Sequence, residues 1–272
     1  MKRAALGTLM VAVLASVAIA QDGVRTARPG ASHGASGGVS EATAALDQAA
    51  AARKFALVFF WKEQSPQTTR AWNTLQTAAG RMSDWAEVVP VQATNPAEKA
   101  LVDRFGTSRA PMPLVLAVAP CGAVTKAFGA VFDEAQLRTA FVSPGTQLCL
   151  KALQDRKLVL LCVFDQAVPA GTAGPAVPPG VRDFKADARF GAASEVVLIN
   201  AGDAGEAGFL QELKVDARAP KPFTVLLAPP GTVVGQFDNR ASKDQLVAKL
   251  TASQSDPCAG GTCGPGGCGP RR

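Results

Sequence analysis

The sequence predicts an α/β protein made of two tandem copies of one module, each a mixed central sheet flanked by helices. Two apolar runs of strand length, KFALVFFW at 54–61 and KLVLLCVFD at 157–165, begin 103 residues apart. A run that is apolar at every position is typical of a central strand covered by helices on both faces. The motifs RAPMP at 109–113 and RAPKP at 218–222 lie 109 residues apart. Repetition at a nearly constant spacing indicates a duplicated domain.

Residues 1–20 have the features of an export signal. Lys2 and Arg3 form a basic start, residues 4–20 are apolar, and Ala18-Ile-Ala20 precedes Gln21 as a small-x-small cleavage motif. A retained membrane anchor is the alternative, although 17 residues is short for a bilayer span. We therefore expect cleavage, a periplasmic or secreted protein with no membrane attachment afterwards, and an oxidising environment for its cysteines.

Residues 21–40 are rich in Gly, Ser and Ala and predict a disordered linker. This segment contains His33, the one histidine of the chain, and there is no tyrosine. Histidine-based metal sites and His-dependent catalytic triads are therefore nearly excluded. The formal charge is +6, or +4 without Lys2 and Arg3, and the positive residues are scattered. We expect no nucleic-acid binding, which needs a concentrated basic surface.

The first module is predicted to span residues 41–145. Its elements alternate as helix, strand, helix, strand, short helix, two hairpin strands and a closing helix. Ser40 and Ser65 precede the first two helices as N-caps, and Asp133 precedes the last. The predicted ranges are 41–53, 54–61, 66–82, 88–93, 96–105, 114–119, 123–128 and 133–141.

The second module, residues 146–252, repeats this order. A Pro/Gly-rich loop at 167–180 replaces the short turn that follows the first strand of the first module. Both modules have a proline-glycine hairpin turn and then an Asp-led helix, with Asp244 in the second copy. The predicted ranges before that turn are 146–155, 157–165, 181–190, 195–200 and 206–215. Residues 253–272 are predicted to form a disordered Cys/Gly-rich tail.

This order of elements resembles the thioredoxin fold. FWKE at 60–63 is similar to the end of the family's first central strand, and APMPL at 110–114 is similar to the segment with its cis-proline. The resemblance makes Pro113 the counterpart of that proline, with Pro222 in its place in the second copy. It implies two thioredoxin-like domains in tandem.

At residues 65–68 the sequence departs from the family that it resembles. Family enzymes have Cys-x-x-Cys there, because the helix N-terminus lowers the pKa of the attacking thiol. This chain has Ser65-Pro-Gln-Thr68. A serine hydroxyl is not ionised near neutral pH, and no histidine is available to activate it. We therefore expect Ser65 to be a helix cap and the site to be non-catalytic, with no cofactor.

The resemblance implies a binding groove in place of the lost chemistry. In the family, backbone groups beside the cis-proline pair with an extended peptide, and here Met112 is the residue before that proline. Ser65, Thr68, Met112 and Pro113 are therefore the candidate peptide-binding residues. The alternative, equally weighted, is a scaffold whose groove no longer binds.

Three of the six cysteines fall within the modules. Cys162 lies in an apolar strand and is expected to be a small core residue. Cys121 lies in a hairpin turn and Cys149 follows the last helix of the first module. Both are expected at the end of the sheet opposite Ser65, where a disulfide would join the two modules; two unrelated thiols are the alternative.

The tail contains Cys258, Cys263 and Cys268, spaced five residues apart. Three interpretations stay open: disulfide formation, binding of a soft metal such as Cu(I) or Zn, and a low-complexity end without a task. The favoured function is binding or scaffolding of extracytoplasmic proteins. The alternatives are a thiol-disulfide oxidoreductase or thiol carrier that uses the tail cysteines, and soft-metal binding by the tail.

Overall fold

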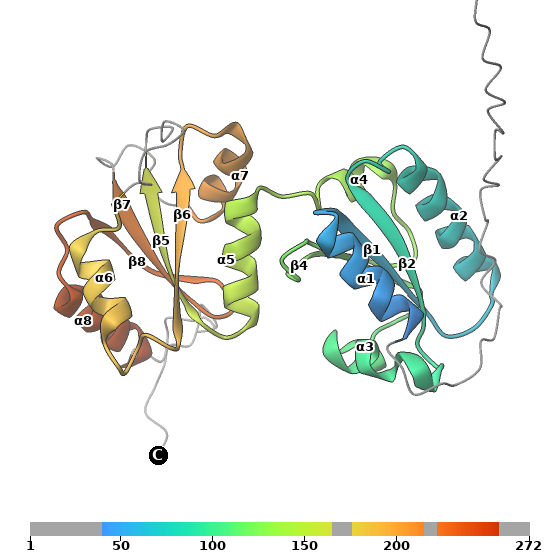
Figure 1. The fold of residues 1–272 in the computed structure, drawn as a ribbon, viewed down its shortest axis with the longest axis horizontal. Helices are drawn as coiled ribbons and strands as arrows, with labels where there is room; N and C mark the ends of the chain where they lie inside the picture. Colours follow the sequence, from blue (N-terminus) through green and yellow to red (C-terminus); the bar gives the residue numbers. More distant parts are fainter. Residues whose placement is uncertain (1–39, 165–175, 215–221, 256–272) are drawn as a thin grey trace, which may run out of the picture. The chain divides into compact units, whose positions relative to one another are not determined.

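The computed structural model describes residues 40–164, 176–214 and 222–255. These residues form two four-stranded sheets, each with helices on both faces (Figure 1). The elements of the first half are α1 (Glu41–Ala51), β1 (Phe55–Trp61), α2 (Pro66–Gly80), β2 (Ala86–Gln92), η1 (Pro96–Glu98), α3 (Lys99–Arg104), η2 (Thr107–Arg109), β3 (Leu114–Val118), β4 (Val124–Phe128) and α4 (Glu134–Arg138).

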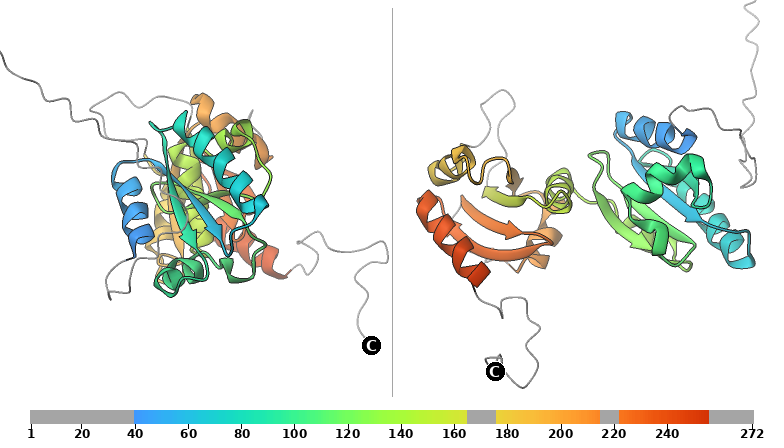
Figure 2. Two further views of the ribbon diagram at one scale, coloured as in Figure 1. Left: turned by 90° about the vertical axis from the view of Figure 1, so that its right-hand side faces the viewer. Right: turned by 90° about the horizontal axis from the view of Figure 1, so that it is seen from below.

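The second half repeats the order of the first (Figure 2). Its elements are α5 (Pro144–Gln154), β5 (Leu158–Phe164), α6 (Pro179–Ala186), β6 (Ser194–Asn200), α7 (Ala204–Glu212), β7 (Phe223–Ala228), β8 (Thr232–Asp238) and α8 (Lys243–Ser255). None of the helices in the described ranges is long and apolar enough to cross a membrane.

The two sheets have the same topology. Their strand orders are β2-β1-β3-β4 and β6-β5-β7-β8. In each, the first strand pairs in parallel with the second and antiparallel with the third, which pairs antiparallel with the fourth. Both hairpins have a register shift, at Ala117/Val118 and at Leu226/Leu227, again 109 residues apart. The predicted duplication is confirmed, and the register shift is repeated with it.

The continuous apolar runs form the central strands, as predicted. All seven residues of β1 are buried. Phe55, Leu57 and Phe59 belong to the core under α2 and α4, whereas Val58 and Phe60 belong to the core under α1. Successive side chains of a strand point to opposite faces, so one apolar strand supplies both layers. Strand β5 does the same in the second half.

Several predicted boundaries are corrected. The helix expected at 96–105 is divided into η1 and α3, and the closing helix of the first half ends at Arg138. The weak helix at 181–190 begins at Pro179 and ends at Ala186. The helix predicted from Thr146 begins at Pro144, because Ser143 Oγ accepts a hydrogen bond from Thr146 N and caps it.

The closing helix expected to begin at Asp244 begins one residue earlier, at Lys243, and Ser242 caps it. Ser242 Oγ accepts from Gln245 N at 3.3 Å, and Gln245 Oε1 accepts from Ser242 N at 2.8 Å. Asp133 and Gln136 make the same reciprocal pair at 2.8 and 3.0 Å. Both closing helices therefore begin with a capping box, in which a short polar side chain and a Gln three residues later satisfy two N–H groups.

Candidate functional site

Ser65 is the N-cap of α2, at the end of the sheet where β1 finishes. Its Oγ accepts a hydrogen bond from Thr68 N at 3.1 Å and lies 2.9 Å from Thr68 Oγ1. Thr68 Oγ1 in turn donates to the carbonyl oxygen of Glu63 at 3.1 Å, and Thr68 is buried. Both hydroxyls are thus occupied in ordering the turn, as the prediction of a helix cap requires.

No buried acid or base stands beside these hydroxyls. In the described ranges, the buried charged residues are Glu98 and Glu206. Glu98 accepts a hydrogen bond from Ser40, and Glu206 accepts from Gly145 and Thr146. Without a partner that removes its proton, the Ser65 hydroxyl is a poor nucleophile.

Met112 and Pro113 lie at the same end of the sheet. Pro113 directly precedes β3, which pairs antiparallel with β1 so that Leu114 lies opposite Phe60. The Met112–Pro113 peptide bond is cis, which the resemblance implied for Pro113. Pro113 is buried and Met112 is half-buried. The topology therefore brings Ser65, Thr68, Met112 and Pro113 together at one end of the first sheet.

The backbone of Met112 has no partner within the part of the chain that the structure describes. No hydrogen bond to its N–H or its carbonyl is present there, although β3 begins only two residues later. A backbone segment that continues a strand without a neighbour offers a donor and an acceptor to an added strand.

Sequence reasoning missed one apolar side chain at this end. Strand β4 runs antiparallel to β3 and ends at Phe128, opposite Val115, so the loop after it leaves the sheet near the start of β3. Val131 in this loop is 91% exposed. Lone exposed apolar residues are ordinary, and no periodicity in the sequence marks this one. Only the strand order places Val131 at the same end as Met112.

The corresponding place in the second half is described only in part. Residues 165–175 of the loop after β5 and Lys221 lie outside the described residues, and Pro222 is half-buried before β7. Helix α6 has no side-chain cap, whereas α2 is capped by Ser65. A cis peptide bond that was not predicted joins Pro229 and Pro230 in the β7–β8 turn.

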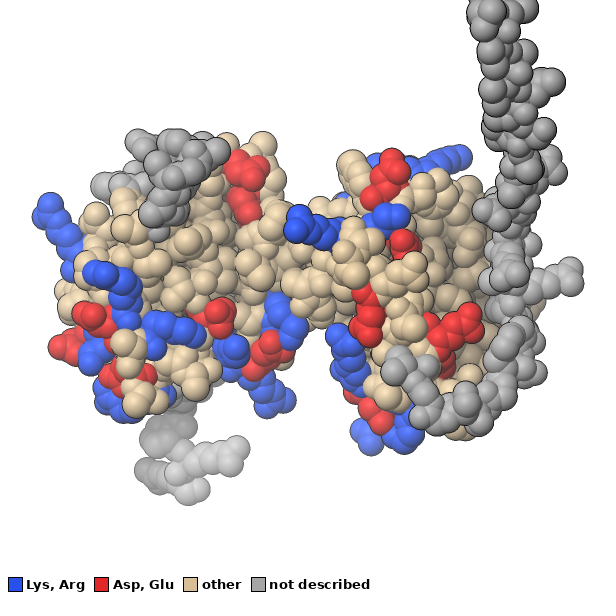
Figure 3. All heavy atoms as spheres, in the orientation of Figure 1, with Lys and Arg blue, Asp and Glu red and all other residues tan. Residues whose placement is uncertain are grey.

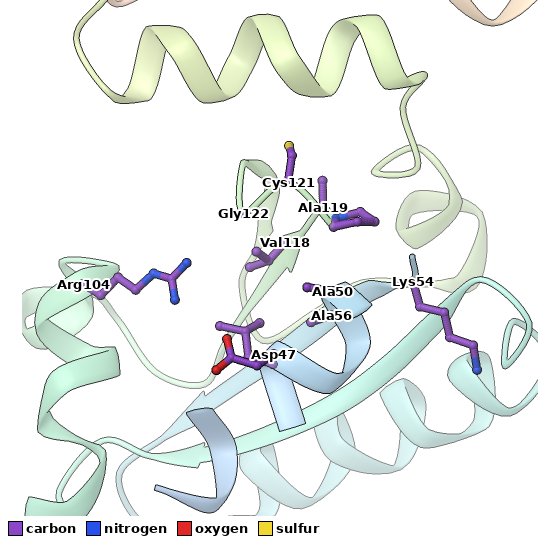
Figure 4. Close-up of a pocket in the computed structure, with 11 residues that line it drawn as sticks. Asp47, Ala50, Lys54, Ala56, Arg104, Val118, Ala119, Cys121 and Gly122 are labelled. Atoms are coloured by element: carbon purple, nitrogen blue, oxygen red, sulfur yellow. The ribbon is translucent and has the colours of Figure 1, made fainter. Parts of the chain in front are cut away.

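A pocket of about 200 Å³ lies at the opposite end of the first sheet, between α1, the start of β1 and the β3–β4 turn (Figure 4). Asp47, Arg104 and Cys121 line it from three different elements. Lys54 also lines it, but its Nζ lies 3.2 Å from a carboxylate oxygen of Glu87. This pocket shares no residue with the Ser65 site.

Cys121, Cys149 and Cys162 are free thiols in the structure. Cys149 is buried in the core of the second half, and Cys121 packs at the core of the first, with its Sγ 3.5 Å from the carbonyl oxygen of Gln147. The structure gives the Cys121–Cys149 disulfide no support, and the pairing stays a prediction that non-reducing peptide mapping would test. Burial raises the pKa of Cys149 to about 12 and that of Cys162 to about 11, so neither is a reactive thiol.

In the described ranges, no three His, Cys, Asp or Glu side chains are placed so that they could hold a metal ion. Cys258, Cys263 and Cys268 lie outside these ranges, as do the export signal and the linker. On the face that Figure 3 shows, Lys and Arg are interspersed with Asp and Glu.

The known proteins that this chain matches are solved structures. No protein-family model matches the sequence, and no curated protein matches it significantly. The solved structures that resemble it are thioredoxin-domain proteins. The germline-specific thioredoxin Deadhead of Drosophila melanogaster is 20% identical, with a TM-score of 0.28, over 34% of this chain and 83% of its own.

Two-domain structures match over more of the chain. The first two thioredoxin domains of Naumovozyma dairenensis Eps1p are 11% identical, with a TM-score of 0.29, over 81% of this chain and 97% of theirs. Human ERp44 is 12% identical, with a TM-score of 0.35, over 82% of this chain and 57% of its own. The fold assignment rests on the strand order and pairing of this chain itself: each of its halves has a thioredoxin-like fold, two of them in tandem.

Proposed function

We propose that this chain is an exported protein that binds extended polypeptide segments without thiol chemistry. The binding site is the end of the first sheet formed by Ser65, Thr68, Met112, Pro113 and Val131. The observation that carries the proposal is the unpaired backbone of Met112 beside β3, which offers strand-like pairing to a peptide.

The hydroxyls at 65 and 68 support binding rather than catalysis. They occupy the place where the resemblance implies two thiols, and both are held in hydrogen bonds that fix the start of α2. Such a turn keeps the rim of the groove in one shape. A preorganised rim lowers the entropy lost when a partner binds.

The exposed Val131 supports an apolar contact at the same place. Because this side chain is 91% exposed, it gains almost no hydrophobic stabilisation in the free protein. It gains some when a partner covers it. Backbone pairing at Met112 and side-chain burial at Val131 together give a site for an extended segment with alternating side chains.

Carboxymethylated α-lactalbumin, which is permanently unfolded and has no free thiol, is a suitable probe. Added to the chain from Gln21 onward, it should shift the amide NMR signals of Ser65, Met112, Leu114 and Val131. Absence of binding, or shifts confined to residues around the Cys121 pocket, would refute the proposal.

Val131→Ser provides the matched variant, because a side chain that is 91% exposed contributes little to folding and serine removes the apolar contact without adding charge. We expect roughly fivefold weaker binding, from the loss of about 1 kcal/mol of apolar contact. Leu148→Ser is the control: Leu148 is 53% exposed on α5 and lies in the other half. Equal binding by both variants would remove Val131 from the site.

Two further assays address the catalytic alternative and export. An insulin-reduction assay should show no turnover by the chain or by a deletion after Gln254; turnover that needs the tail would favour the oxidoreductase. Export is tested by sequencing the N-terminus of the protein recovered outside the cytoplasm, which should begin at Gln21.

A further inference from the structure

Three exposed cations surround the Ser65 site, each from a different segment. Lys62 follows β1, Arg70 lies in the second turn of α2, and Arg109 ends η2. Arg70 Nε donates to the carbonyl oxygen of Pro66 at 3.1 Å, which folds its side chain back towards the start of the helix. These cations therefore share the end of the sheet where Met112 lies.

A contact joins two of these segments directly. Lys62 Nζ lies 3.5 Å from the carbonyl oxygen of Ser108, the residue before Arg109. The segment from Ser108 to Met112 therefore runs beside the residues that follow β1. Lys62 and Arg109 therefore lie in neighbouring segments, and Arg109 is three residues before the unpaired backbone of Met112.

None of these cations has a carboxylate partner in the described ranges. Glu63 is the one acidic residue in the segments 62–70 and 107–113. The nearest carboxylates along the loop after Val131 are already engaged: Asp133 caps α4, and Glu134 pairs with Arg81 and Arg138. The N-terminus of α2 adds a partial positive charge at Ser65.

We propose that this site selects extended polypeptide segments in which acidic side chains flank an apolar one. The apolar side chain covers Val131, the backbone pairs with Met112, and the flanking carboxylates face Lys62, Arg70 and Arg109. The inference rests on the proposed function and adds the charge of the partner to it. Complementary charges raise the rate of encounter and exclude partners of like charge.

A set of three peptides tests the charge of the partner. Each is cysteine-free, has the same central apolar residues, and has Glu, Gln or Lys at the flanking positions; binding is followed by fluorescence anisotropy. At about 0.01 M salt, where the Debye length is about 30 Å, we expect the Glu peptide to bind roughly tenfold more tightly than the Gln peptide. The Lys peptide should bind least, and about 1 M salt should nearly abolish the preference.

The outcomes separate the two proposals. Equal binding of all three peptides overturns the charge selection and leaves peptide binding intact. No binding of any peptide overturns both. Binding of inorganic polyphosphate as tight as that of the Glu peptide would show a plain anion site, and would overturn the selection of polypeptide.

Charge reversal identifies the residues responsible. Lys62→Glu and Arg109→Glu should each reduce the preference for the Glu peptide about threefold at low salt and change the binding of the Gln peptide little. Arg104→Glu is the control, because Arg104 is also exposed and has no carboxylate partner in the described ranges but lines the pocket at the opposite end. An equal loss in all three variants would mean that only net charge matters, and would overturn the site.

Discussion

Helices α1 and α5 begin in the same way in the two halves. Ser40 and Ser143 cap them, and each cap hydroxyl lies 2.9 Å from the hydroxyl of a threonine three residues later. A buried glutamate from the segment after the second strand then meets each helix start: Glu98 accepts from Ser40 Oγ at 2.8 Å, and Glu206 accepts from Thr146 Oγ1 at 3.1 Å. A carboxylate at a helix N-terminus is stabilised by the unpaired N–H groups there.

The halves differ most around their second helices. Helix α2 has 15 residues and a side-chain cap, whereas α6 has 8 residues and none. The comparison teaches that the duplicated chain repeats the contacts that hold each sheet and its helices together. The end that bears the site differs between the copies, because loop residues there contribute little to the core.

The closing helices should give the largest effect. Leu137 and Leu246 are equivalent and fully buried. Leu137→Ala and Leu246→Ala should each lower the free energy of unfolding by roughly 2–5 kcal/mol, because each leaves a cavity in the core. Amide hydrogen exchange would assign the loss to one half. A small loss for one of them would show that the two cores are not equivalent.

Substitution of the two buried glutamates should lower the free energy of unfolding by different amounts. Glu206→Ala leaves Gly145 N and Thr146 Oγ1 without an acceptor, which costs roughly 2–3 kcal/mol. Glu98→Ala should cost about 1 kcal/mol, because its partner Ser40 is only half-buried and water replaces the carboxylate. Urea denaturation measures both, and equal losses would contradict the distinction.

Gly145 explains why the two glutamates differ. A Cβ at Gly145 would lie 2.6 Å from Glu206 Oε1 and 2.8 Å from Ile199 Cγ1, so only glycine lets this carboxylate reach the backbone. The first half has Ala42 at the equivalent place. Gly145→Ala should destabilise the second half by about 1–3 kcal/mol. Thermal unfolding would show this as a lower Tm, and an unchanged Tm would mean that Glu206 moves aside freely.

The capping boxes should contribute equally. Asp133→Ala and Ser242→Ala each remove an acceptor from the first turn of α4 or α8, and each should cost about 1 kcal/mol. Asp244→Ala is the control for α8 and should cost less, because the structure places the cap at Ser242. A larger loss for Asp244→Ala than for Ser242→Ala would contradict the cap at Ser242.

Asp187 gives the smallest effect. It is the C-cap of α6 and pairs with Lys243 at the start of α8, whereas the first half has the opposite charges: Arg81, the C-cap of α2, pairs with Glu134 at the start of α4. Hydrogen bonds from Arg189, and then from Lys243, hold the pKa of Asp187 well below its usual range. A carboxylate with a lowered pKa stabilises the fold above its ordinary pKa near 4, and this stabilisation is lost as the pH falls further. Asp187→Asn should therefore be less stable than the parent at pH 7 and approach it in acid. A difference that is independent of pH would exclude this ion pair as the cause.

Much of the fold was predictable because its signals are local. The unbroken apolar run of β1, the serine caps before α1 and α2, and the repeated RAPxP motifs each act over a few residues. The same locality explains the errors. Ser242 and Asp244 are both good caps by residue type, and only the backbone geometry chooses between them.

The sequence predicted only those residues of the candidate site whose place follows from the order of elements. Ser65, Thr68, Met112 and Pro113 could be named from the order of elements, whereas Val131, Lys62 and Arg109 could not. Exposed valine, lysine and arginine are common at surfaces and have no signal of their own. They become a site when the pairing of β1, β3 and β4 brings three separate loops to one end of the sheet.

The sequence by itself determined the duplicated α/β architecture and the replacement of two thiols by hydroxyls. Hydrophobic periodicity and residue type are properties of the sequence and need no knowledge of which residues are in contact. The tertiary structure alone decided which side chains meet: Glu206 with Gly145, Lys62 with Ser108, and Val131 at the end where Met112 lies unpaired. Such meetings depend on strand order and register, which join residues far apart in the chain and leave no trace in local composition.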